Sequence, residues 1–188
     1  MRGGIRITAL SACLLASSLA TSQGVMADEV LTDSFKNHPE RDWRFFADTV
    51  MGGISTGNVV FGSKDGAYVR LTGNVSTAKN GGFIQIRKQL PSARPKGISG
   101  IRLVARGNGQ RYFIHLRTRG TLLPWQYYQS GFEVSGNWKE FRLPFTSFNR
   151  SGRLLAKTPA PSSLKSVAIV AFGRDHTADV QVKEIGFY

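Results

Sequence analysis

From Val30 onward, apolar and polar residues alternate along the chain with a period close to two, and turn residues interrupt the alternation at short intervals. This period is typical of β-strands, whose successive side chains point to opposite faces of a sheet. It predicts strands over residues 58–61, 67–72, 82–89, 98–106, 111–118, 125–134, 138–143, 164–172 and 179–187. Many short strands separated by turns are typical of a sandwich or barrel, so we expect an all-β protein.

The alternation also predicts which side chains face the core. The expected inward positions are Val69, Leu71, Ile84, Ile86, Ile101, Leu103, Ala105, Tyr112, Ile114 and Leu116. The positions between them carry arginines, one histidine and aromatic residues, and they form one outer face if the strands share a sheet. The candidate binding residues of this basic and aromatic face are Arg70, Arg87, Arg102, Arg106, His115, Arg117, Trp125 and Tyr128.

Two interpretations of this face remain open. Arginine forks suit carboxylate, sulfate or phosphate, and aromatic rings suit the faces of sugars, so one interpretation is a ligand-binding surface. The other is the ordinary solvated face of an antiparallel sheet, in which arginine stems cover apolar neighbours.

The first residues have the pattern of an export signal. Arg2 and Arg6 precede an uncharged apolar segment over residues 7–20, and Ala27 ends a run of small residues suited to a signal peptidase. We expect a cleaved secretory signal peptide over residues 1–27 and a single β-sandwich domain over residues 28–188, located in a periplasm or secreted. The alternatives are a buried N-terminal helix and a lipoprotein processing site at Cys13.

Composition narrows the chemistry of the mature domain. The only cysteine is Cys13, so cleavage after Ala27 leaves no disulfide framework, thiol nucleophile or thiolate metal site. The formal net charge of the whole chain is +13. This charge favours acidic glycans, phospholipid head groups at a membrane surface or an acidic protein as partners, although it also serves solubility alone. We expect no nucleic-acid partner, because an exported protein rarely meets one.

The sequence contains no recognisable catalytic arrangement. His38, His115 and His176 lie far apart, without the spacing of a metal-binding motif. The acidic residues are few and scattered, and neither a nucleophile elbow nor a phosphate-binding or dinucleotide-binding loop is present. We therefore expect a protein that is not an enzyme and holds neither a metal nor a cofactor.

Three motifs are more specific than this general pattern. The segment Asp48-Thr49-Val50-Met51-Gly52-Gly53-Ile54-Ser55 is followed by Asn80-Gly81-Gly82-Phe83 and by Arg106-Gly107-Asn108-Gly109-Gln110-Arg111-Tyr112. In this order, they resemble the D-x-V-M-G-G-x-S, N-G-G-F and R-G-D-G-R-x-Y segments of the complex I intermediate-associated protein 30 family. The resemblance covers residues 43–188. One departure is Asn108, where the family often has aspartate, and this weakens the idea that the turn coordinates a cation.

The resemblance implies a jelly-roll β-sandwich similar to galactose-binding domains and to several carbohydrate-binding modules. Eukaryotic members of the family are similar to chaperones that help to assemble respiratory complex I. A bacterial, exported member cannot simply inherit that role, because the side of the membrane that corresponds to the mitochondrial matrix is the cytoplasm.

The motif residues have a structural and a functional interpretation. In the first, the glycines allow close backbone approach or positive φ, Met51 fills the core, and Asp48 and Ser55 bond nearby backbone amides. In the second, the motifs line a site at the loop end for a partner or a polar ligand. The candidate residues of this loop-end site are Asp48, Met51, Gly52, Gly53, Ser55, Asn80, Gly81 and Gly82.

Two functional hypotheses follow. The first is a non-catalytic interaction or assembly factor for an envelope or membrane protein complex. The alternative is a module that binds carbohydrate or an anionic ligand through Trp125, Tyr127, Tyr128 and the arginine face.

Overall fold

The computed structural model describes Met1, residues 30–92 and residues 97–188. Its strands are β1 (Val30–Asp33), β2 (Trp43–Ala47), β3 (Thr56–Gly62), β4 (Tyr68–Val75), β5 (Phe83–Gln89), β6 (Gly100–Gly107), β7 (Arg111–Thr118), β8 (Tyr128–Glu133), β9 (Lys139–Pro144), β10 (Asn149–Arg150), β11 (Leu164–Phe172) and β12 (His176–Phe187). Its helical turns are α1 (Pro39–Asp42), η1 (Asp48–Met51), η2 (Ala78–Asn80), η3 (Phe145–Ser147) and η4 (Pro161–Ser163). In this part of the chain, no helix is both long and apolar enough to cross a membrane.

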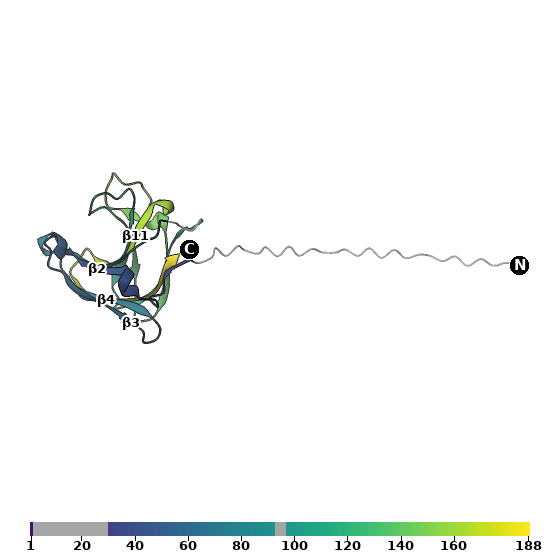
Figure 1. Cartoon of the computed structure of the whole chain (residues 1–188), viewed down its shortest axis with the longest axis horizontal. Coiled ribbons are helices and arrows are strands. Elements are labelled where there is room, and N and C mark those ends of the chain that lie inside the picture. The colour runs from purple at the N-terminus through teal and green to yellow at the C-terminus, as the bar shows by residue number, and fades with distance from the viewer. Residues whose placement is uncertain (2–29, 93–96) are drawn as a thin grey trace.

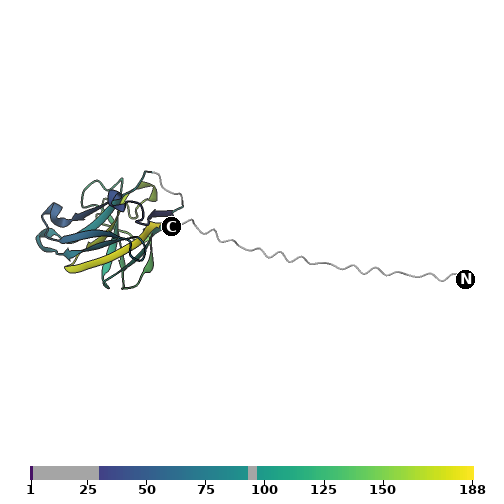
Figure 2. The same cartoon turned by 60° about the horizontal axis from the view of Figure 1, so that its bottom comes forward.

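The strands form two six-stranded antiparallel sheets that pack face to face (Figures 1 and 2). Sheet I has the order β3-β4-β12-β6-β9, with β1 paired to the last residues of β12 beyond the end of β4. Sheet II has the order β10-β8-β7-β11-β5-β2. In Figure 1, β3 and β4 of sheet I lie below β2 and β11 of sheet II. The expected all-β jelly-roll sandwich is confirmed.

The predicted strands agree closely with the observed ones, and two of them, residues 111–118 and 164–172, have the observed bounds of β7 and β11. Three strands were not predicted: β1, β2 and β10. β2 was not predicted because its run of apolar residues, Phe45-Phe46-Ala47, breaks the alternation. β10 was not predicted because it is only two residues long. Residues 125–127 precede β8 rather than belonging to it. Apart from Met1, the predicted signal peptide lies outside the described residues, and so does Cys13.

The core lies between the two sheets, and every position predicted to face inward is buried. Leu103, Ile114, Ile84 and Tyr112 are all 0% exposed. Burying one large apolar side chain in this way contributes about 1.5–3 kcal/mol relative to leaving it in water. The core residues come from both sheets, so their packing holds the sandwich closed.

A polar contact at one edge also joins the two sheets. Asp33, at the end of β1 in sheet I, accepts hydrogen bonds from the indole of Trp43 at 2.8 Å and from the Lys88 ammonium at 2.8 Å. Trp43 and Lys88 belong to β2 and β5 of sheet II. Burial alone would raise the pKa of Asp33, but hydrogen bonds from Lys88, Trp43 and the Phe35 amide lower it. The ionised carboxylate is therefore the stable form in this contact.

Candidate functional site

Asp48 connects the first two sequence motifs. It begins η1, directly after β2, and its side chain is 0% exposed. Its Oδ1 accepts a hydrogen bond from the Ser55 amide at 2.9 Å, and its Oδ2 accepts one from the Ser55 hydroxyl. The same Oδ2 accepts hydrogen bonds from the amides of Gly82 at 2.6 Å and Phe83 at 3.2 Å. One carboxylate thus holds the loop after β2 against the start of β5.

The glycines of the motifs make this close approach possible. A Cβ atom on Gly53 would overlap the carboxyl carbon of Asp48, and one on Gly81 would overlap its Oδ2. A side chain at either position would push the carboxylate away from its donors. We call Asp48, Gly53, Ser55, Gly81 and Gly82 the Asp48 cluster.

The sequence allowed a structural role or a ligand-binding role for these motif residues, and the contacts of the Asp48 cluster support the structural role. Burial alone would raise the pKa of Asp48, but hydrogen bonds from the Ser55 hydroxyl and from the Gly82, Ser55 and Phe83 amides lower it. All these donors come from the protein itself, and Asp48, Ser55 and Gly82 are buried. The expectation that these three residues contact a ligand is therefore wrong. Gly53 and Gly81 are half-buried, while Met51, Gly52 and Asn80 are exposed.

Beside the Asp48 cluster, a groove with a volume of about 880 Å³ runs over the outer face of sheet II. Its lining residues from the strands are Phe46 of β2, Phe83, Gln85 and Arg87 of β5, His115 and Arg117 of β7, and Ser166, Ala168 and Phe172 of β11. The loop residues that line it are Val50, Met51, Asn80, Gly81, Pro124, Trp125, Tyr127 and Ser151. Of the two interpretations of Met51, the core filler is wrong, because its side chain is 53% exposed and lines the groove.

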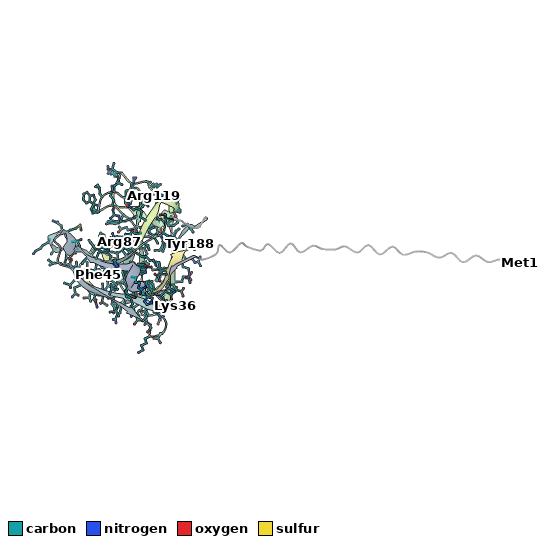
Figure 3. The ribbon with its side chains drawn as sticks, viewed as in Figure 1. Met1, Lys36, Phe45, Arg87, Arg119 and Tyr188 are labelled. Atoms are coloured by element: carbon teal, nitrogen blue, oxygen red, sulfur yellow. The ribbon has the colours of Figure 1, made fainter. Side chains whose placement is uncertain are left out.

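The groove exists because small side chains occupy the middle strand. Ala168 of β11 lies between Arg87 of β5 and His115 of β7 in the strand register, and Ser166 lies beside Arg117. Long or aromatic side chains thus flank short ones, and this leaves a trough along β11. Figure 3 shows Arg87 near the middle of the molecule, between the strands labelled β2 and β11 in Figure 1.

His115 lies on the predicted outer face, but its side chain is buried and does not add to the positive charge of that face. Tyr127 stacks on its ring with centroids 4.1 Å apart and planes 7° apart, and Phe172 meets it edge-on at 5.4 Å. Burial lowers the pKa of His115 to about 3, although the side chain of Gln129 opposes the shift. His115 is therefore a neutral imidazole that supports Tyr127 from below.

The condition for a single basic face, that its strands share a sheet, is not met, because the six basic candidates divide between the two sheets. Arg70, Arg102 and Arg106 project from β4 and β6 of sheet I, whereas Arg87, His115 and Arg117 belong to β5 and β7 of sheet II. The reason is that β6 and β7, although consecutive, lie in different sheets. Alternation within one strand cannot reveal which strands become neighbours.

The arginines of sheet I are occupied by other protein groups. Arg70 pairs with Asp179 at 2.7 Å, and Arg102 pairs with Glu140 and Glu184, each at 2.9 Å. Arg106 lies over the Trp138 ring at 4.5 Å and donates a hydrogen bond to Gln181. These residues form the solvated, charge-paired face that the sequence offered as the alternative interpretation.

Two aromatic candidates of the glycan hypothesis, Trp125 and Tyr128, differ in exposure. Trp125 is 63% exposed and lines the groove together with Tyr127. Tyr128 is 2% exposed and belongs to the core, so its assignment to a binding face is wrong. The signal for this was present, since Tyr128 has the same strand parity as the apolar residues Phe132 and Val134. The groove aromatics Phe46 and Phe172 were not recognised from the sequence.

The third motif also has a structural role. The Asn108 amide donates a hydrogen bond to the Thr177 carbonyl at 2.8 Å and accepts one from the Tyr112 hydroxyl at 2.7 Å. An aspartate could accept but not donate here, so the asparagine suits this turn. Within the described residues, no group of three His, Cys, Asp or Glu side chains is placed to hold a metal ion.

Comparisons with known proteins agree with this architecture. The family model for Complex I intermediate-associated protein 30 (CIA30) matches residues 33–182. A family 11 carbohydrate-binding module from Clostridium thermocellum, in complex with a β-1,3-1,4-mixed-linked tetrasaccharide, is 16% identical with a TM-score of 0.68 over 85% of this chain and 94% of that one. The family 11 module of the C. thermocellum cellulase Lic26A-Cel5E is also 16% identical, with a TM-score of 0.68 over 85% and 93% of the two chains. Such low identity establishes the fold alone. No curated protein sequence matches this chain.

Replacing Asp48 by alanine should lower the free energy of unfolding by at least about 3 kcal/mol, because it leaves several buried donors without a partner. Urea unfolding at pH 7 would measure the loss. The lowered pKa of Asp48 means that its stabilisation is present above about pH 4, the pKa range of an unfolded aspartate, and is lost as pH falls through the folded value. The difference between wild type and Asp48→Ala should therefore shrink in acid.

A pair of glycine variants tests whether the close backbone approach to Asp48 matters for stability. Gly53→Ala should destabilise the protein strongly, whereas Gly136→Ala should have little effect, since nothing lies within 4 Å of its Cβ position. Equal unfolding midpoints for Asp48→Ala and wild type at pH 7 would contradict the structural role.

Proposed function

This chain belongs to the complex I intermediate-associated protein 30 family, and we propose that it is an exported, non-catalytic protein that binds a saccharide chain in the sheet II groove. The observation that carries this proposal is the aromatic and polar lining of the groove. Export is proposed from the signal-like pattern of residues 1–27, with the processed protein in a periplasm or outside the cell.

The aromatic side chains supply surfaces on which sugar rings can stack. Trp125 is largely exposed at the groove wall, and Tyr127 is held against His115 by ring stacking. Aromatic rings combine a large apolar face with little conformational freedom, so binding costs little ordering of the site. A rigid platform of this kind suits the apolar face of a pyranose ring.

Polar groups beside these rings suit the hydroxyl groups of a sugar. Asn80 and Gln85 carry amides that both donate and accept hydrogen bonds, and Arg87 offers only donors. A groove with mostly apolar walls and a few placed polar groups is the usual form of a small-molecule site.

The groove lining supports binding rather than cleavage. Glycoside hydrolysis commonly uses a pair of carboxyl groups on either side of the scissile bond. The described residues that line the groove include neither aspartate nor glutamate. The likeness of the fold to a module bound to a tetrasaccharide agrees with the proposal, but one fold serves many functions, so the lining carries the argument.

Replacing Trp125 by alanine should weaken saccharide binding about fivefold or more, because a stacking contact contributes about 1 kcal/mol beyond simple burial. The measurement is a glycan-array screen followed by calorimetric titration with the best ligand. Trp138→Ala is the matched control, since Trp138 lies against Tyr68 and Arg106 on sheet I. Equal binding by the Trp125 variant and wild type, at unchanged melting temperature, would contradict the proposed site.

A second candidate function, an interaction or assembly factor for an envelope or membrane protein complex, is favoured by exposed apolar side chains on two loops. Leu122 is 82% exposed and Leu154 is 92% exposed. Their loops are joined, because the Ser151 hydroxyl donates a hydrogen bond to the Trp125 carbonyl at 3.0 Å. Large apolar side chains gathered at a surface often contact another protein.

The double variant Leu122→Ser with Leu154→Ser tests this candidate, since neither residue lines the groove. If the protein is an assembly factor, crosslinking and co-purification from the native envelope should lose a defined complex in this variant. Saccharide binding should persist, because the groove is unchanged. A pull-down identical to that of the wild type would exclude these loops as the docking surface.

A further inference from the structure

We infer that the groove selects saccharides that carry oxyanions, either carboxylate or sulfate groups, through Arg87 and Arg117. This inference rests on the proposed function, because it names the class of saccharide for the same groove. It depends on the charge and packing of these two side chains.

Arg87 has no counter-ion in the part of the chain that the structure describes. It lies over the Phe46 ring with its guanidinium carbon 4.2 Å from the ring centroid. Among the described residues, its guanidinium takes part in no hydrogen bond and no ion pair, in contrast to Arg70 and Arg102 of sheet I. The planar fork is held by stacking while its donors stay available, which is the arrangement that bidentate binding of an oxyanion needs.

Arg117 adds a second positive charge to the same groove. Its guanidinium donates hydrogen bonds to the carbonyls of Leu123 at 2.9 Å and Thr121 at 3.1 Å, so it also holds the loop that carries Trp125. Neutral carbonyls leave its charge uncompensated. Burial lowers the pKa of Arg87, and the nearby positive charge of Arg117 lowers it further.

No other charge in the lining offsets these two cations. The lining residues within the described ranges include neither aspartate nor glutamate, and His115 is neutral above about pH 3. A groove lined by one sign of charge concentrates counter-ions of the opposite sign. An oxyanion bound here would relieve the repulsion between Arg87 and Arg117, whereas a neutral sugar would leave it in place.

The positions of the two arginines suit a chain ligand. They lie on β5 and β7, on either side of β11, so their strands are roughly 10 Å apart. In the strand register, the short side chains of Ser166 and Ala168 lie between the two arginine-bearing strands. The aromatic walls distinguish this site from a simple anion site, since they require a ring-bearing ligand. An acidic polysaccharide satisfies both conditions.

The test uses ligands that differ in charge but not in backbone. Oligogalacturonides are compared with the same oligomers after methyl esterification, and a sulfated galactan oligosaccharide is compared with its desulfated form. In at least one pair, the acidic member should bind about tenfold more tightly to the wild-type protein at low salt, and the preference should shrink as salt rises. Binding of neutral and acidic members with equal affinity in both pairs would overturn the inference.

Arg87→Gln should remove most of the preference for the acidic member, measured as the ratio of the affinities of the acidic and neutral members. Arg87→Lys, which keeps the charge but loses the fork, should retain part of the preference. Arg106→Gln is the matched control, because Arg106 stacks on Trp138 at 4.5 Å on the opposite sheet, and it should retain the full preference. An equal loss in Arg87→Gln and Arg106→Gln would mean attraction by net charge alone, which overturns the inference.

The outcomes also separate this inference from the proposed function. Binding of neutral glycans that depends on Trp125, with no preference for acidic members, would leave the proposed function standing and overturn the inference. Failure of every glycan to bind would overturn both. The protein could instead bind phosphatidylglycerol vesicles through Arg87 and show no preference for acidic over neutral glycans. That result would overturn the inference in favour of a lipid headgroup.

Discussion

The buried carboxylate of Asp48 is the interaction on which the rest of the site depends. It accepts hydrogen bonds from Ser55, Gly82 and Phe83, so η1, the residue before β3 and the start of β5 become one unit. The exposed residues Val50 and Met51 of this unit line the groove. The most specific motif of the sequence therefore builds the wall of the site, and the residues proposed to contact the ligand lie elsewhere.

The groove itself is a consequence of strand order. β11 enters sheet II between β5 and β7, and it brings Ser166 and Ala168 between the long side chains of its neighbours. The same topology places β6 and β7 in different sheets. This separates the charge-paired arginines of sheet I from Arg87 and Arg117, which have no carboxylate partner among the described residues. Arginines that are spread along the sequence thus leave uncompensated positive charge in the sheet II groove.

Much of the fold could be predicted from the sequence because strand periodicity and core burial are local properties. Ile101 and Ile114 were assigned to the core by alternation alone, and the glycine-rich motifs were expected to support close backbone approach. The site was harder to predict, because it depends on pairing between distant strands. Phe46 lies on a strand whose alternation is broken, and His115 was assigned to the correct face although its burial beneath Tyr127 follows from a loop. Export rests on residues outside the described part and remains a prediction.

The central claim is that Asp48 and its partners form a fixed wall, beside which the sheet II groove binds the ligand. A ¹H–¹⁵N NMR titration with an oligosaccharide tests it most directly, because it reports every backbone amide and the Trp125 indole at once. Shifts should concentrate on β5, β7, β11 and Trp125, while the buried Ser55 amide, which is bonded to Asp48, should remain protected from hydrogen exchange throughout. Shifts confined to sheet I, or rapid exchange of the Ser55 amide, would contradict the account.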